Sequence, residues 1–379
     1  MNQNLINALL STALEHYRLS DNGEMSKYIS PVDLVKNINL ELPEEKLSEK
    51  GIQDFYNQYL NQAVNTSHKS YCNQLWSKVE WPSLLGEILA LVTNTSMYTY
   101  EVAPVATLLE HEMISQLNRF IWKNSGDGIM TSGGTASNLQ ALLMARNHFI
   151  KSIKTKGIEG KKIAIITSKV AHYSIKRAAN ILGIGSENCF EIATDSNDKM
   201  SIEHLQKTLV AMKNSNIVPF CIVATAGTTV KGAYDPILEI SKISQRENLW
   251  LHVDGAYGAN VLLSQKHNYL MSGVEVADSV SWDFHKAMGV HLTCAFLLTK
   301  HQNLLKQTIN SGDDSYLFHN NDQQNLYDDL GPRSLQCGRR VDILKLWLTW
   351  LANGKSGLEQ RVNDLFNSAK TFSQIITNH

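Results

Sequence analysis

The segment Asp278-Ser279-Val280-Ser281-Trp282-Asp283-Phe284-His285-Lys286 decides how the rest of this 379-residue chain is interpreted. It predicts a short β-strand followed by a polar turn that presents one lysine directly after a histidine. Taken alone, a lysine beyond a predicted strand is usually a solvated surface residue. A second segment, Trp250-Leu251-His252-Val253-Asp254-Gly255-Ala256-Tyr257-Gly258, predicts another strand with Asp254 at its C-terminal end. Open α/β sheets bind ligands at the carboxyl ends of their strands, so we expect Asp254 and Lys286 to meet at one such edge.

Predicted strands and helices alternate from residue 160 onward. We expect strands at 162–168, 189–193, 219–225, 249–253, 279–282 and 293–299, and helices at 173–182, 201–213 and 237–247. Apolar runs such as 163–166 and 221–224 suit strands that are buried on both faces. This pattern predicts an α/β fold with a mostly parallel sheet between helices.

The flanking segments are mainly helical in pattern. Further helices are expected at 5–17, 82–92, 105–122, 139–149, 341–351 and 358–376, with Gly354 ending the helix before it. Residues 5–17 carry an apolar stripe that should pack on another surface, such as a second subunit. Residues 94–101 interleave polar and aromatic side chains, which suits either a pocket lining or a loop. The polar, irregular segment 311–332 is of the kind that is functional or disordered.

Composition excludes several classes of protein. The net charge of −1 offers no electrostatic footprint for nucleic acid or acidic membranes. Five scattered cysteines without a CxxC pair argue against a disulfide framework or a zinc site, and for a reducing compartment. The first 20 residues lack the pattern of a signal peptide, and no stretch approaches the length of a membrane span. We therefore expect a cytoplasmic protein without a metal, a nucleic acid or a membrane as partner.

A glycine pair precedes the helix expected at 139–149. Gly133 and Gly134 stand among small hydroxyl residues, and such a turn before a helix favours an anion such as phosphate. Alone this signal is weak, and the turn matches neither the Walker loop nor GxGxxG, which disfavours ATP and dinucleotides. Combined with Asp254 and Lys286 it suits pyridoxal 5'-phosphate. This cofactor needs a lysine for its Schiff base and an acid against its pyridine nitrogen.

With these segments in place, the chain resembles the group II pyridoxal phosphate-dependent amino-acid decarboxylases of fold type I. Within them it is most similar to the branch of glutamate, aspartate and cysteine sulfinate decarboxylases. The resemblance runs from about residue 68 to the end, and its motifs occur in the family's order: 73–75, 94–104, 132–139, 171–176, 224–229, 251–258, 285–286, 316–318 and 336–340. It implies an N-terminal helical dimerisation segment at 1–67 and a large cofactor-binding domain at 68–355 with a mostly parallel seven-stranded sheet. Residues 356–379 would begin a C-terminal small domain that is largely missing.

The resemblance also implies roles for single residues. Its catalytic residues would be Lys286 as the Schiff-base lysine, Asp254 facing the pyridine nitrogen, His172 stacked on the ring, and Tyr316, which protonates the substrate carbon after CO2 has left. The same resemblance places Gly133, Gly134, Thr135 and His285 around the phosphate, Ala256 under the ring, and Thr229 beside the cofactor. A departure stands at Asp283, close to the phosphate. A second anion there is unfavourable unless His285 is protonated or the carboxylate turns away.

Substrate binding is implied for Gln74, Ser96 and Arg339, where a guanidinium would hold a carboxylate. Arg339 could instead be a structural arginine at a helix start. The bulky Trp76 would shorten the pocket, which favours aspartate or cysteine sulfinate over glutamate.

The resemblance implies a homodimer in which the Tyr316 loop reaches the partner's site. Two alternatives stay open: another fold-type-I enzyme, such as a transaminase or a different lyase, or a truncated cofactor-binding homologue of low activity.

Overall fold

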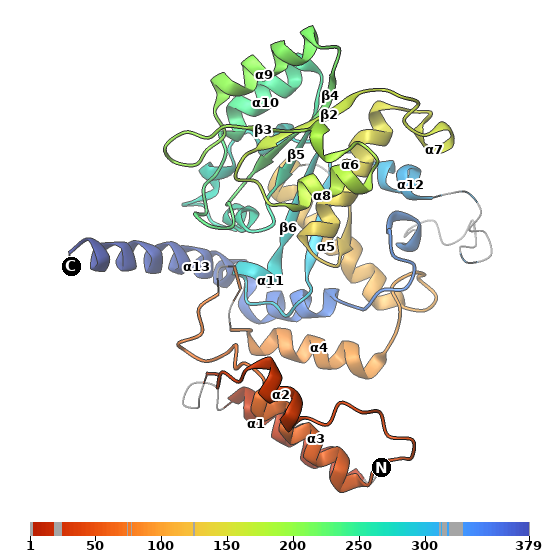
Figure 1. The fold of residues 1–379 in the computed structure, drawn as a ribbon, viewed down its shortest axis with the longest axis vertical. Helices are drawn as coiled ribbons and strands as arrows, with labels where there is room; N and C mark the ends of the chain where they lie inside the picture. Colours follow the sequence, from red (N-terminus) through yellow and green to blue (C-terminus); the bar gives the residue numbers. More distant parts are fainter. Residues whose placement is uncertain are drawn as a thin grey trace. The chain divides into compact units, whose positions relative to one another are not determined.

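The computed structural model describes residues 3–18, 25–73, 75–76, 78–123, 126–310, 312, 317 and 329–378. The chain divides into two compact units, residues 1–79 and 80–379, which are treated separately below (Figure 1). The boundaries expected after residues 67 and 355 remain predictions.

The first unit is helical. It contains α1 (Gln3–Arg18), α2 (Pro31–Asn37) and α3 (Glu49–Gln62). Ser30 and Ser48 cap α2 and α3, because each serine side chain accepts a backbone N–H of the first turn. The Tyr56 hydroxyl of α3 donates to the carbonyl of Leu9 in α1 at 2.9 Å. The apolar stripe expected at 5–17 therefore lies on a real helix that α3 contacts.

The second unit is built on a seven-stranded sheet. Its strands are β1 (Asp127–Thr131), β2 (Ile163–Ser168), β3 (Cys189–Ile192), β4 (Val218–Thr225), β5 (Trp250–Asp254), β6 (Ser279–Asp283) and β7 (Ala295–Thr299). They lie in the order β1-β7-β6-β5-β4-β2-β3. Neighbours from β3 to β6 are parallel, whereas β7 runs antiparallel to both β6 and β1. The prediction of a mostly parallel sheet is confirmed.

Helices and short 3-10 turns connect and cover these strands. The helices are α4 (Trp81–Thr93), α5 (Pro104–Trp122), α6 (Gly134–Phe149), α7 (Ile153–Lys156), α8 (Ser174–Ile181), α9 (Ile202–Asn214), α10 (Ile237–Glu247), α11 (Phe284–Ala287), α12 (Leu304–Ile309) and α13 (Ile343–Thr377). The 3-10 turns are η2 (Ser186–Asn188), η3 (Gly258–Leu263), η4 (Asn268–Met271), η5 (Val274–Val276) and η6 (Gly331–Arg333). No helix among the described residues is long and apolar enough to cross a membrane.

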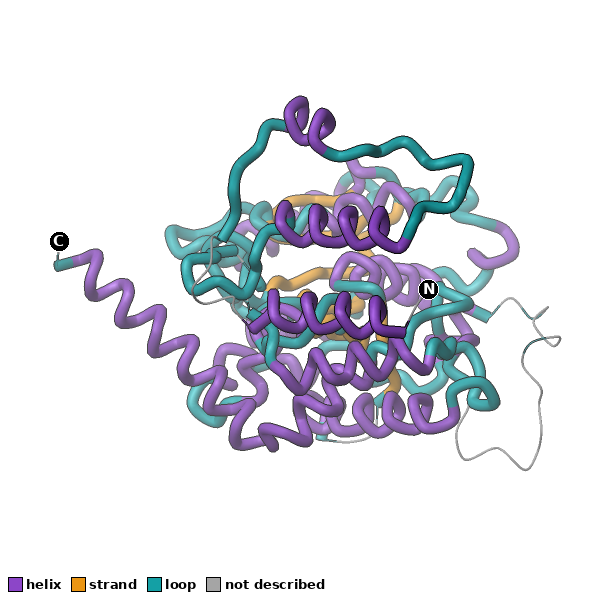
Figure 2. The backbone as a smooth tube through the Cα atoms, turned by 90° about the horizontal axis from the view of Figure 1, so that it is seen from below, coloured by secondary structure: helices purple, strands orange, loops and turns teal. Residues whose placement is uncertain are grey.

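Side-chain alternation assigns α6 and α5 to opposite faces of the sheet. His252 and Asp254, two apart on β5, both contact Asn138 of α6. Trp282, one residue after the partner of Asp254 on β6, points to the opposite face of the sheet. It packs edge-on against Phe120 of α5, with ring centroids 6.3 Å apart. The strands are accordingly enclosed between helices (Figure 2). Polar groups on the α6 face therefore mark the side of the sheet where a ligand can be held.

Two elements differ from the sequence-based expectations. Helix α6 begins at Gly134 rather than at residue 139, so the glycine turn forms its first residues. Strand β1 was not predicted, since it is short, contains Gly128, and is defined by its antiparallel pairing with β7. The expected break at Gly354 is present, with φ 62° and ψ 176° inside α13.

Candidate active site

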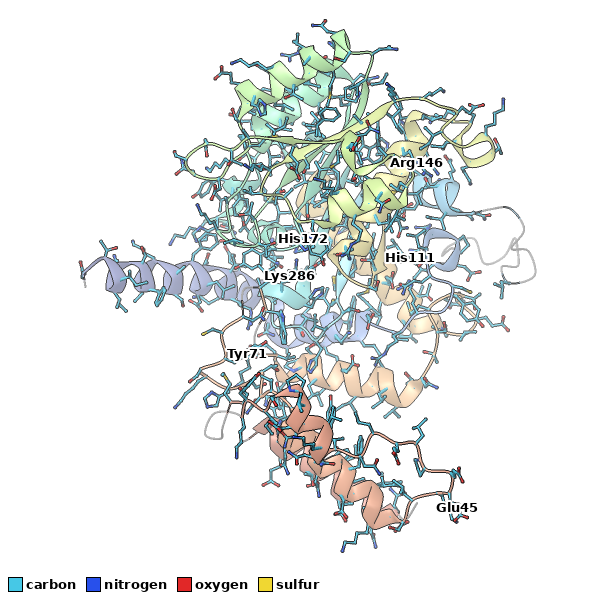
Figure 3. The ribbon with its side chains drawn as sticks, viewed as in Figure 1. Glu45, Tyr71, His111, Arg146, His172 and Lys286 are labelled. Atoms are coloured by element: carbon cyan, nitrogen blue, oxygen red, sulfur yellow. The ribbon has the colours of Figure 1, made fainter. Side chains whose placement is uncertain are left out.

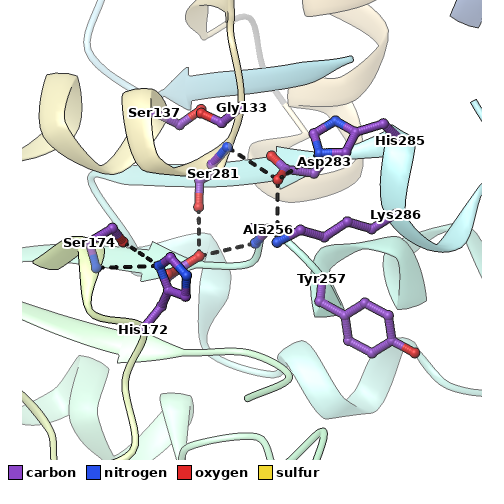
Figure 4. A network of polar contacts seen from close by, with 12 residues as sticks. Gly133, Ser137, His172, Ser174, Ala256, Tyr257, Ser281, Asp283, His285 and Lys286 are labelled. Carbon is purple, nitrogen blue, oxygen red and sulfur yellow. Dashed lines mark hydrogen bonds and ion pairs between the residues drawn. The ribbon is translucent and has the colours of Figure 1, made fainter. Parts of the chain in front are cut away.

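One edge of the sheet collects the residues singled out by the sequence. His172 follows β2, Thr229 follows β4, Asp254 ends β5, and Lys286 lies in α11 directly after β6. Because β1 and β6 are both antiparallel to β7, they run parallel to each other. The turn that follows β1 therefore brings Gly133 to this same edge. His172 and Lys286 lie close together in Figures 3 and 4.

The Asp254 carboxylate is buried and fixed by three donors. Oδ2 accepts from Asn138 Nδ2 at 2.8 Å, and Oδ1 accepts from Ser281 Oγ at 3.1 Å and from the Ala256 backbone N–H at 3.2 Å. The carboxylate is thus held in one orientation at the end of β5.

Asn138 joins several of these groups, and the sequence did not single it out. Its Nδ2 also donates to Ser174 Oγ at 3.0 Å, while its Oδ1 faces His252 Nε2 at 3.0 Å. Burial lowers the pKa of His252 to about 4, so this imidazole is neutral. Its Nδ1 lies 2.9 Å from Ser279 Oγ and 3.2 Å from the Ser279 carbonyl oxygen, so both ring nitrogens have polar neighbours.

His172 stands beside this network. Its Nδ1 lies 2.8 Å from Ser174 Oγ and accepts the Ser174 backbone N–H at 3.3 Å. Burial lowers the pKa of His172, while Asp254 raises it and Lys286 lowers it further. The imidazole is therefore neutral near pH 7 and lies within electrostatic range of both the carboxylate and the amine.

Lys286 pairs with a second carboxylate, Asp283. The Nζ of Lys286 lies 3.4 Å from Asp283 Oδ2, and the lysine side chain is 20% exposed whereas that of Asp283 is 1% exposed. The same Oδ2 accepts the Gly134 backbone N–H at 3.2 Å and lies 3.5 Å from His285 Nε2 (Figure 4). The Nδ1 of His285 lies 3.0 Å from both the backbone nitrogen and the carbonyl oxygen of Cys294.

The glycine turn has open space next to Gly133 and is closely packed at Gly134. Gly133 has φ 134°, and a side chain built there would meet nothing within 4 Å. A Cβ on Gly134 would lie 2.9 Å from Asp283 Oδ2 and 3.0 Å from the Ala256 Cβ, so that position favours glycine. Thr135 is exposed in the first turn of α6 and Thr229 is half-buried.

Two of the expected substrate-binding residues are neighbours. The Met97 N–H donates to the Arg339 carbonyl at 3.0 Å, and the position of a Cβ on Gly338 is 3.6 Å from Ser96 Oγ. Both terminal nitrogens of Arg339 bind Glu110, each at 2.8 Å, in a pair that is almost completely buried. Ser96 Oγ and Arg339 Nε are buried without a hydrogen-bond partner among the described residues.

Gln74 and Tyr316 lie outside the described residues. Their expected roles remain predictions.

The residues at this edge fit pyridoxal 5'-phosphate. They supply a partly exposed primary amine, a buried carboxylate, a neutral imidazole, and an open turn at the N-terminus of a helix. Among the described residues, no group of three or more His, Cys, Asp or Glu side chains could hold a metal ion.

Comparison with known proteins assigns the class. The family model described as the pyridoxal-dependent decarboxylase conserved domain matches residues 31–379, and the chain belongs to this family. It is a pyridoxal 5'-phosphate-dependent amino-acid decarboxylase.

Individual relatives agree with this assignment. The human protein named cysteine sulfinic acid decarboxylase is 39% identical over 351 residues, which cover 92% of this chain and 71% of the relative. The human acidic amino acid decarboxylase GADL1 is 38% identical over 346 residues, or 90% of this chain and 66% of that protein. The crystal structure of mouse CSAD superposes with a TM-score of 0.93 at 35% identity and covers all of this chain and 79% of the mouse chain.

Proposed function

We propose that this chain removes the α-carboxyl group of a short acidic amino acid, aspartate or cysteine sulfinate in preference to glutamate, and releases CO2 and the amine. The observation that carries the choice of substrate is the pair of buried donors Ser96 Oγ and Arg339 Nε. Both lack a partner among the described residues although they are neighbours. Buried polar groups are normally hydrogen-bonded, so two donors without a described partner, on neighbouring residues, suit an anionic acceptor on a ligand.

The names of the relatives support the same class of substrate, since two of them act on cysteine sulfinic acid and on acidic amino acids. The family resemblance implies a position for Trp76 at which a large residue would shorten the pocket and favour a short side chain. Within residues 1–79 its indole packs against Tyr71, with ring centroids 5.6 Å apart, and the half-buried ring is large.

Lys286 would hold the cofactor covalently, and Asp254 would hold its ring nitrogen. Gly133, Gly134, Thr135 and His285 would hold the phosphate, with His172 on one face of the ring and Ala256 on the other. When bound, the cofactor supplies an aromatic ring that accepts the electron pair left behind by CO2. Thr229 would lie beside it.

Arg339 would orient the substrate carboxylate while Glu110 holds the guanidinium in place. Because the substrate's own groups are then fixed, the bond to the leaving carboxylate can be aligned before it breaks. Tyr316 would deliver the proton that the substrate carbon takes up. Gln74 would add a further contact to the substrate.

Product analysis tests this proposal. We expect purified protein with added cofactor to release CO2 and the amine from aspartate or cysteine sulfinate, with kcat/KM at least about 100-fold above that for 2,4-diaminobutyrate or an aromatic amino acid. Lys286→Ala protein supplies the background rate. A keto acid as the main product would instead support a transaminase, and a clear preference for a basic or aromatic substrate would refute the acidic pocket.

The working form is proposed to be a homodimer. Leu85, Leu89 and Val92 of α4 are 55%, 43% and 75% exposed and share one side of the helix. On another side, Gly86 packs closely against the backbone of Leu344 in α13. An exposed apolar stripe on a helix already packed on its other side suits an interface between copies, here two copies of this chain. In that dimer the segment with Tyr316 would reach the partner's site.

Mixed dimers test both parts of this arrangement. Lys286→Ala and Tyr316→Phe proteins are each expected to be deficient, and random exchange of their subunits should restore about a quarter of wild-type activity. The reason is that half of the dimers are mixed, and each has one site with Lys286 from one chain and Tyr316 from the other. No recovery after demonstrated exchange would mean that Tyr316 acts within its own chain, and a chain that stays monomeric would refute the dimer itself. Proteins mixed without exchange are the control.

A reducing compartment such as the cytoplasm is proposed as its location. All five cysteines are free thiols, and Cys189, Cys221 and Cys294 are buried. Cell fractionation of the tagged chain would contradict this if the protein were recovered in an oxidising compartment.

A further inference from the structure

An internal carboxylate lies where the cofactor's phosphate is proposed to bind. Asp283 Oδ2 accepts the N–H of Gly134, the first residue of the 16-residue helix α6, and also faces His285 Nε2 and Lys286 Nζ. Gly134 and His285 are two of the groups assigned to the phosphate. We call these three groups around Asp283, namely Gly134 N–H, His285 Nε2 and Lys286 Nζ, the anion site.

The other oxygen of the carboxylate has no hydrogen-bond partner in the part of the chain that the structure describes. Asp283 Oδ1 is buried and makes no hydrogen bond to any described residue. A carboxylate has acceptor capacity for several donors, so an ionised Asp283 is incompletely satisfied here. A protonated Asp283 would instead carry one O–H donor, which is what an adjacent phosphate oxygen requires.

Several charged or titratable groups act on Asp283, from different elements. Lys286 and His285 of α11 favour its ionised form, and Asp254 at the end of β5 opposes it. His172, after β2, is within electrostatic range of Asp283, and Lys345 of α13 acts on His285. Burial is the largest effect, and it raises the pKa of Asp283 and lowers the pKa of His285. Both shifts favour the neutral forms of this pair.

We propose that the Asp283 carboxylate substitutes for the cofactor's phosphate in the anion site of the cofactor-free protein, and that it takes up one proton from solvent when the phosphate binds. This inference rests on the proposed function, because it takes the phosphate site from it. Two consequences follow. Cofactor binding is coupled to proton uptake, and Lys286 loses its ion pair as the phosphate arrives, which frees the amine to react.

The sign of the pH dependence follows from linkage. A phosphate beside Asp283 favours the protonated acid, so the cofactor binds better at a pH where this acid is already protonated. Affinity should fall as the pH rises above the pKa of Asp283 in the cofactor-free protein. Pyridoxal, which lacks the phosphate, should not show this part of the dependence.

The experiment compares dissociation constants for pyridoxal 5'-phosphate and pyridoxal, measured by absorbance and by quenching of protein fluorescence on the full chain after cofactor removal. It uses wild type, Asp283→Asn and the matched control Asp364→Asn, which removes one exposed carboxylate of α13, between about pH 6 and pH 9. We expect Asp283→Asn to bind the phosphorylated cofactor at least about tenfold more tightly at the upper pH, with little change for pyridoxal. The ratio of the two constants should lose most of its pH dependence in this variant. Asp364→Asn should behave as wild type.

Binding of inorganic phosphate tests the anion site separately from the reaction of the cofactor's aldehyde with Lys286. It should raise the melting temperature of Asp283→Asn more than that of wild type, because the anion site of the variant holds no carboxylate. If Asp283→Asn fails to fold, the pH dependence of the ratio of the two dissociation constants in wild type still tests the inference. A ratio that does not change with pH beyond the titration of the phosphate itself overturns the inference.

The outcomes separate this inference from the proposed function. Suppose that the phosphorylated cofactor binds tightly and that the ratio of the two dissociation constants is the same in wild type and Asp283→Asn. This result is compatible with the proposed decarboxylase and refutes the role of Asp283. Weaker binding in Asp283→Asn with unchanged pyridoxal binding also refutes it, since the carboxylate would then help to hold the phosphate. Binding of neither aldehyde to any variant would refute both proposals.

Discussion

Lys286→Ala is expected to lose decarboxylation by at least about 10³-fold and to lose covalent attachment of the cofactor. The physical reason is that Lys286 supplies the primary amine at the edge where Asp254, His172 and the glycine turn converge. Mass spectrometry after borohydride reduction measures attachment, and CO2 release measures turnover. Lys286→Arg keeps a positive charge near Asp283 but not the reactive amine, so it should be as inactive as the alanine variant.

Lys300→Ala is the matched control for this experiment. Lys300 also pairs with an aspartate, Asp278, at 2.8 Å, but at the opposite edge of the same strands. Its removal should leave both attachment and turnover near the wild-type level. Residual attachment in Lys286→Ala, mapped to a different lysine, would show that the amine has been assigned to the wrong residue.

Asp254→Asn is expected to lower kcat by about 10²–10³-fold, the range seen when a single group that stabilises developing charge is removed. The change removes the negative charge expected to face the cofactor's ring nitrogen. It also places an amide among the donors Asn138, Ser281 and the Ala256 N–H, so that its NH2 group must face a donor instead of an acceptor. The visible absorbance of the bound cofactor should then respond to pH differently from wild type.

Asp278→Asn is the companion control. Asp278, just before β6, accepts the Leu251 N–H at 2.8 Å at the start of β5, so it is also an aspartate that contacts β5 but at the opposite end from Asp254. Its replacement should affect stability more than kcat. Equal losses of kcat in the two variants would argue that Asp254 acts only by holding the fold.

Much of the large unit could be predicted because its signals are local. Buried strands such as β2 and β4 are continuous apolar runs, and α10 was expected at the residues where it occurs, 237–247. The position of Asp254 and Lys286 at one edge followed from the rule that ligands bind at the carboxyl ends of parallel strands. The dimer, the Tyr316 loop and the role of each site residue remain predictions.

The parts that could not be predicted depend on contacts between distant segments. Asn138 resembles any polar residue in the first turns of a helix until β5 places His252 and Asp254 against it. The polar residues of β6 near Asn138, by contrast, did carry a signal in the sequence. Ser279, Ser281 and Asp283 alternate within a fully buried strand, and that spacing marks a polar face turned toward a helix. Glu110, far from Arg339 in sequence, carried no comparable signal.

The antiparallel strand β7 has a consequence for the order in which this protein is made. It lies between β1 and β6 and pairs with both, so it fixes the spacing between the glycine turn and Lys286. On the ribosome, residues 133, 254 and 286 all emerge before residues 295–299 do. A nascent chain therefore carries all three residues before it has the strand that holds two of their segments at the right separation.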